Sequence, residues 1–183
     1  KRPSYQEMGE SLANAMRRMI TLGEFEFDDI LETRFELESL CCRFAAKRLS
    51  QVDVAAMKLE IARQRDPEIE DVGFCASDVL FHNALAQAAH NNVLRFVMLA
   101  LNESLNPVTN LITFRFRDRE IIADQHDRIL NAIATGNAED AVGALREQVE
   151  YLRSKYSDAR AWKDKKKSKS AVEMALHASA ERR

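Results

Sequence analysis

Apolar residues recur every three or four positions through most of this chain, and this periodicity restricts its fold more than any other feature. In the segment after Asp118, for example, one side of a helix would carry Ile122, His126, Ile129 and Ile133. Five glycines and three prolines among 183 residues leave room for few tight turns. The pattern therefore predicts an all-α protein.

Local start and stop signals divide this pattern into helices. Capping boxes at Ser4–Glu7 and Ser50–Asp53 begin two of them, Pro67 ends one, and Gly136 ends another. The expected helices cover 4–22, 28–48, 51–65, 70–89, 93–116, 118–135 and 138 to beyond 151, with a loose helix over 171–180. Six or seven amphipathic helices joined by short loops predict an antiparallel bundle that encloses a ligand or metal cavity.

One part of this assignment has an alternative. Asn106–Pro107 should kink or break the helix that begins at Val93. Beyond it, the alternation of Leu111, Ile112, Phe114 and Phe116 could also form a short strand. We favour a helix, because no partner strand is predicted elsewhere.

Composition excludes several classes of protein. No run of about 18 apolar residues exists, so the sequence predicts no membrane span and no membrane partner. Three cysteines, two of them adjacent (Cys41 and Cys42), form neither a disulfide framework nor a zinc knuckle. They indicate core residues in a cytoplasmic protein.

Charge is unevenly distributed along the chain. From Tyr151 onward there are ten Lys or Arg and four Asp or Glu, whereas the preceding part is acidic. A broad basic surface for nucleic acid is therefore not expected on the main body. The basic run 163–169 is interpreted as a solvated end.

Polar residues interrupt the apolar faces at a few positions. Asp78 and His82 stand four apart, so they share one face of their helix, and that face is flanked by Phe74, Phe81 and Leu85. A carboxylate and an imidazole in an apolar interior require partners.

Arg34, His126 and Gln148 occupy comparable positions on other helices. Together with Asp78 and His82 they could supply three or four ligands to Zn, Ni, Mn or Fe. The alternative for the Asp-x-x-x-His pair is a simple hydrogen bond, and for His126 a satisfied core histidine.

Three segments resemble the effector-binding domain of FadR-type GntR regulators. These are Asp28–Glu38 (DDILETRFELE), Asp78–His82 (DVLFH) and Gln125–Asn137 (QHDRILNAIATGN). The resemblance implies an all-α bundle that binds a divalent metal through one Asp and three His. It also implies that the metal and an arginine hold a small organic acid.

Carried over by position, the resemblance assigns metal ligation to Asp78, His82 and His126, and carboxylate binding to Arg34. The fourth metal position falls on Gln148, where the family usually has histidine. A glutamine carbonyl is a weak ligand for zinc-like ions. A divalent metal (Zn, Ni or Mn), a small carboxylate effector and a homodimer are therefore expectations from the resemblance.

The resemblance also suggests a domain organisation. Residues 1–27 would form a linker helix that joins a winged helix-turn-helix domain absent from this chain, through which alone DNA would be bound. Residues 28–160 would form the effector-binding bundle, and residues 161–183 a basic polar tail that is partly disordered. The expected function is ligand sensing that modulates DNA binding, in a domain that is not an enzyme.

Two other functions remain open from the residues alone. A metal-dependent hydrolase or oxidase could be built on such a bundle, although the four carboxylates of a di-iron site are missing. A dimerisation domain with a vestigial site is the other alternative. Arg115, Arg117 and Arg119 are secondary candidates for ligand contact, and we favour surface charges for each.

Overall fold

The described part of the chain is entirely helical apart from its loops, which confirms the predicted all-α class. The computed structural model describes residues 4–105 and 115–180, with side chains as far as Trp162. Its helices are α1 (Tyr5–Leu22), α2 (Phe27–Arg48), α3 (Gln51–Gln64), α4 (Asp71–Ala88), α5 (Asn92–Ser104), α7 (Arg119–Ala134) and α8 (Ala138–Ala180). Within these residues, no helix is both long and apolar enough to cross a bilayer.

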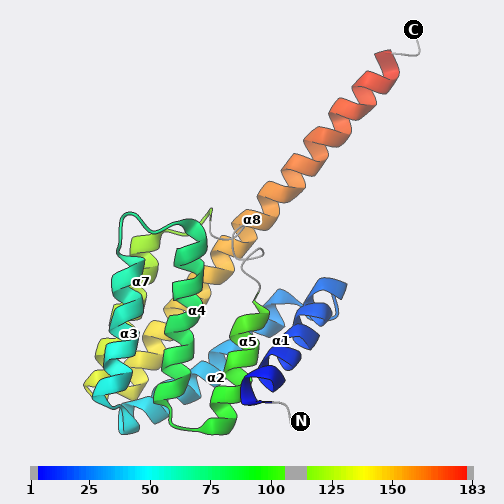
Figure 1. Cartoon of the computed structure of the whole chain (residues 1–183). Coiled ribbons are helices and arrows are strands. Elements are labelled where there is room, and N and C mark those ends of the chain that lie inside the picture. The colour runs from blue at the N-terminus through cyan, green and yellow to red at the C-terminus, as the bar shows by residue number, and fades with distance from the viewer. Residues whose placement is uncertain (1–3, 106–114, 181–183) are drawn as a thin grey trace.

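The helices form a bundle in which α2 lies against most of the others. It contacts α4, α5, α7 and α8, while α3 packs mainly on α4 and α7. Helix α1 lies at the edge of the bundle against α5 (Figure 1). The elements that carry the predicted site residues are therefore neighbours in space.

The predicted helix ends have clear physical causes. Ser4 and Ser50 each accept a hydrogen bond from the backbone N–H three residues later, and Glu7 and Asp53 complete the two capping boxes. Gly23 ends α1 with a φ of 77°, a left-handed conformation that glycine adopts without a steric cost. These signals are local, so the sequence was sufficient to find them.

Two segments differ from the sequence-based expectation or lie outside the described residues. Arg115 and Phe116 form a turn instead of the end of a helix, while Leu111, Ile112 and Phe114 lie outside the described residues. Helix α8 runs without a break from the bundle to Ala180, across the expected boundary at residue 161 (Figure 1). Residues 161–180 contain neither glycine nor proline and are rich in alanine and lysine, which favour helix. The division into bundle and tail stays a prediction.

A single large core holds the bundle together. Phe81, Leu85, Met57, Ile129 and Leu145 are at most 1% exposed and belong to one contiguous apolar cluster. A smaller cluster around Phe74, Cys75 and Ile122 extends it toward the start of α4. All three cysteines are free and buried, as predicted. Along α4, Asp78 comes between Phe74 and Cys75 of the smaller cluster and Phe81 of the larger one.

Candidate metal centre

Helices α4, α7 and α8 bring four of the predicted site residues together. Asp78 and His82 come from α4, His126 from α7 and Gln148 from α8, and all four are at most 5% exposed. One ligand atom from each of Asp78, His82 and His126 lies within 4.8 Å of the others. This donor set, one carboxylate oxygen and two imidazole nitrogens, suits a divalent transition metal.

The two imidazoles present the same nitrogen to Asp78. Its Oδ1 lies 3.5 Å from Nε2 of His126 and 3.9 Å from Nε2 of His82. Among the described residues, neither Oδ1 of Asp78 nor Nε2 of His82 has a hydrogen-bond partner, although both are buried. Buried acceptors without partners are costly, and a bound cation would satisfy both. The residues present therefore fit a metal.

The opposite nitrogens of the imidazoles meet two residues that the sequence analysis did not single out. Nδ1 of His82 lies 2.6 Å from Oε1 of Glu38, and Nδ1 of His126 lies 2.7 Å from Oε1 of Gln64. Glu38 comes from α2 and Gln64 from the last residue of α3. For Glu38, the available signal was its position: it is a charged residue one turn after Arg34 on an otherwise buried helix face.

Gln148 occupies the expected fourth position but shows a different contact. Its Nε2 lies 2.7 Å from Nε2 of His126, so the amide donates to the lone pair that a metal would use. Amide oxygen and nitrogen are assigned from their hydrogen-bond partners. A half-turn of this amide would bring its oxygen toward the same point.

Two arginines border the site. Arg34 is buried, and its Nε pairs with Oε2 of Glu38 at 3.2 Å. Arg117 is also buried, and its Nη1 lies 3.7 Å from Oδ2 of Asp78. The interpretation of Arg117 as a surface charge was therefore wrong, because the turn before α7 directs it inward.

The other two arginines of that segment do not reach the centre. Arg119 donates to the backbone oxygen of Ile69 and pairs with Asp71 at 2.5 Å. Arg115 is exposed. For these two, the surface interpretation agrees with the structure.

The electrostatics keep the ligand atoms in the protonation states that a metal requires. Burial by itself would raise the pKa of Asp78, but Arg117, the two imidazoles and Arg34 outweigh it and lower the pKa to about 2. Burial and His82 hold the pKa of His126 well below its usual value. At neutral pH the centre therefore offers a carboxylate from Asp78 and a neutral imidazole from His126.

Comparison with known proteins shows the family. The FCD domain family matches residues 29–151, which is more than half of the chain. The chain belongs to the FCD domain family. This is the effector-binding domain of GntR-family regulators, so the predicted resemblance is confirmed.

Three relatives of this FCD domain are transcriptional regulators. The Glc operon transcriptional activator of Escherichia coli K12 is 30% identical over 139 residues, which is 71% of this chain and 55% of the relative. A regulatory protein named for the L-lactate dehydrogenase operon of the same strain is 29% identical over 133 residues, 68% of this chain and 49% of the relative. LutR of Bacillus subtilis 168 is 27% identical over 128 residues, which is 63% of this chain and 55% of the relative. The chain thus spans about half the length of the curated relatives that it matches.

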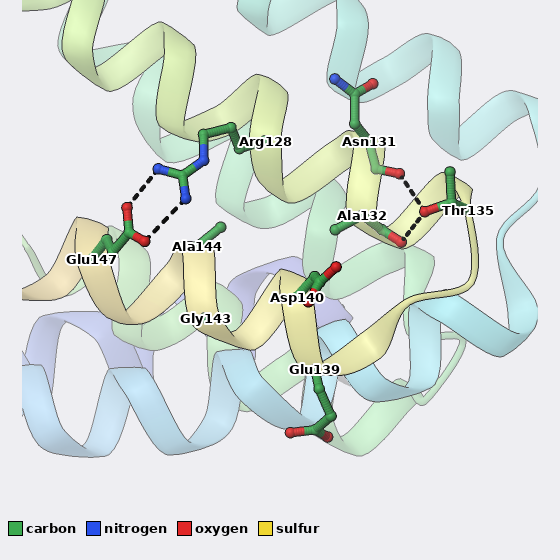
Figure 2. A pocket seen from close by; sticks show the side chains of 9 residues that line it. All are labelled: Arg128, Asn131, Ala132, Thr135, Glu139, Asp140, Gly143, Ala144 and Glu147. Carbon is green, nitrogen blue, oxygen red and sulfur yellow. Dashed lines mark hydrogen bonds and ion pairs between the residues drawn. The ribbon is translucent and has the colours of Figure 1, made fainter.

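A surface groove of the FCD domain lies apart from this centre. It runs between α7 and α8, and Arg128 and Glu147 close one side through two hydrogen bonds (Figure 2). Its lining includes three acidic side chains (Glu139, Asp140 and Glu147), and none of the predicted site residues contributes. This groove offers no cation for a carboxylate other than Arg128, which is already paired. The buried centre is the better candidate for function.

Proposed function

We propose that this FCD domain senses a small carboxylate by binding it beside a divalent metal. The observation that carries the proposal is the buried set of Asp78, His82 and His126, in which acceptor atoms without partners converge. Such an arrangement is expensive to bury unless a cation belongs to it.

Asp78, His82 and His126 would hold the metal, and Gln148 would offer its carbonyl oxygen once its amide has turned. The metal would supply a Lewis-acidic position for one carboxylate oxygen of the effector. Around it, the protein contributes two buried guanidinium groups, Arg34 and Arg117. Within the described residues, the guanidinium of Arg34 pairs through Nε with Glu38, and its Nη1 and Nη2 groups would be available for a bidentate contact.

The chemical class of the effector follows from these groups. Two guanidinium groups and a metal select an anion, and the enclosed position favours a small one. L-lactate is a reasonable first probe, because one relative is named for the L-lactate dehydrogenase operon. We propose that effector binding changes the affinity for DNA of a longer regulator, and that the domain acts as a homodimer.

Thermal unfolding tests the binding function directly. The melting temperature is measured with Zn, Ni or Mn and with a chelator, each with and without a panel of small acids that includes L-lactate. Specific binding should raise the melting temperature, and the increase should disappear in Asp78→Ala, His82→Ala and His126→Ala. Arg34→Ala should lose the response to acids while it keeps that to metal.

A matched control is His90→Ala, which removes a histidine outside the centre and should keep the metal response. No response of the wild type to any metal or acid would refute the sensor and leave a dimerisation domain with a vestigial site. Conversion of an acid in the presence of metal would favour the hydrolase or oxidase.

A further inference from the structure

We propose that Glu38 and Gln64 are positioning residues that direct Nε2 of both imidazoles toward Asp78. The inference rests on the proposed function, since it concerns how the metal ligands are prepared. It assigns a role to two buried side chains that do not contact the metal position themselves.

The first step is the chemistry of the imidazole ring. A neutral histidine carries one proton, and only the nitrogen without that proton can bind a metal. A ligand histidine is therefore competent in one tautomer and blocked in the other. An acceptor beside Nδ1 holds the proton there and leaves the Nε2 lone pair exposed.

Glu38 supplies such an acceptor for His82. Nδ1 and Oε1 lie 2.6 Å apart, although their geometry is not that of a regular hydrogen bond. Two lone pairs would repel each other at that distance, so the contact favours a proton on Nδ1. A carboxylate can only accept, so in this contact the proton can be supplied only by Nδ1 of His82. Arg34 fixes the other carboxylate oxygen at 3.2 Å, which leaves Oε1 to His82.

Gln64 supplies the acceptor for His126, but through an amide. Its Oε1 lies 2.7 Å from Nδ1, while the Nε2 group of Gln148 donates to the opposite ring nitrogen. The two contacts agree, since both require the proton on Nδ1. If both amides turned, however, the same geometry would hold the blocked tautomer. The carboxylate of Glu38 therefore favours one tautomer of His82, whereas the tautomer of His126 depends on the orientation of two amides.

The metal-free chain provides the first test. Two-bond ¹H–¹⁵N NMR spectra of chain labelled with ¹⁵N-histidine report which ring nitrogen carries the proton. In the wild type, both His82 and His126 should carry it on Nδ1. In Glu38→Ala the signal of His82 should move toward the Nε2–H form. In Gln64→Leu the signal of His126 should do the same, because the amide of Gln148 can then turn and accept from Nε2. A wild-type His82 with its proton on Nε2 would overturn the proposal without any variant.

Metal affinity provides the second test. Competition with a chromophoric chelator should show zinc binding weakened by roughly 10- to 100-fold in Glu38→Ala and in Gln64→Leu. Glu60→Ala and Gln125→Leu are the matched controls, because both alter buried side chains outside the centre. Their zinc affinity should stay within about twofold of the wild type.

The two tests separate this proposal from the proposed function. If the wild type binds no metal but both rings carry the proton on Nδ1, the sensor fails and the positioning role stands. If metal binds and the Glu38 and Gln64 variants bind it as tightly as their controls, the positioning role fails and the sensor stands.

Discussion

Gln148 belongs to the proposed centre, but its contact there differs from that of a metal ligand. Its amide nitrogen lies 2.7 Å from the ring nitrogen of His126 that faces Asp78. A metal that takes this lone pair must first displace the amide hydrogen bond. A net hydrogen bond is worth about 1 kcal/mol, so the contact would lower the affinity of the proposed centre for a metal without excluding one.

Gln148→His should therefore tighten zinc binding by at least about tenfold, because a good nitrogen ligand replaces a competing donor. The measurement is competition with a chromophoric chelator at neutral pH. Gln125→His is the control: it places a new histidine next to His126 in sequence but on another side of α7, and the affinity should not change. An unchanged affinity in Gln148→His would contradict the assignment of a fourth ligand position.

The sequence singled out those residues of the proposed centre whose signals are local or belong to the family pattern. Asp78 and His82 could be found because a spacing of four places both on one helical face. Glu38 and Gln64 were not singled out, and Arg117 was named only as a secondary candidate, because their positions depend on contacts between helices that periodicity does not place. Arg117 lies in a turn, where no periodic signal indicates which way a side chain points.

At the scale of the elements, a polar contact joins the start of α3 to the end of α4. Asp53 accepts hydrogen bonds from the backbone N–H and hydroxyl of Ser50, and its Oδ2 lies 2.8 Å from Nε2 of His90. Burial would raise the pKa of Asp53, but the contacts with Ser50 and His90 lower it. His90 takes a φ of 48°, so this contact holds a residue in an unfavourable backbone conformation.

Asp53→Asn should reduce the free energy of unfolding by about 1 kcal/mol at pH 7, the order of one hydrogen bond, because the side chain loses the charge that its contacts with Ser50 and His90 favour. A carboxyl whose pKa is lower in the folded state stabilises the fold above its unfolded pKa of about 3.9 and loses that contribution as the pH falls through the folded value. The difference between wild type and variant should therefore shrink below about pH 4. Urea unfolding at several pH values from 7 down to 3 measures it, with Glu32→Gln as an exposed control. A difference that is constant over this range would contradict the electrostatic part of the argument.

The elements themselves were largely predictable, with clear exceptions. Capping boxes and the glycine after α1 placed helix ends within a few residues. The sequence did not predict that Arg115 and Phe116 form a turn, since alternating apolar residues suit more than one structure. The sequence analysis also underestimated the length of α8. The polar composition of its last part suggests fraying, although the individual residues favour helix.

For the whole molecule, α8 is the element that departs from the compact bundle. With 43 residues and a rise of about 1.5 Å each, it is roughly 65 Å long. Its first part packs on α2 and α7, and its last part projects beyond the bundle (Figure 1). The stability of the bundle should therefore depend on the first part alone.

A chain that ends at Lys163 should keep its melting temperature within about 2 °C of the full chain, because the change in stability is then below about 0.5 kcal/mol. Differential scanning calorimetry measures this at one chain concentration. The control is a chain that ends at Arg146, which loses the buried Gln148, Val149 and Leu152 and should not fold cooperatively. A large drop for the first truncation would show that the projecting part of α8 contributes to the fold.

The turn that carries Arg117 has one more consequence. Its backbone N–H at Asp118 donates to the hydroxyl of Tyr151 at 2.7 Å, and the ring of Phe116 lies 6.2 Å from that of Trp162. Trp162 is the single tryptophan of the chain, so the intrinsic ultraviolet emission comes from a ring that touches the neighbour of Arg117. An anion that draws Arg117 toward it would shift this turn and change the colour or intensity of that emission. If the proposed acid binds beside Arg117, the emission of Trp162 would report its arrival and departure in real time without any label.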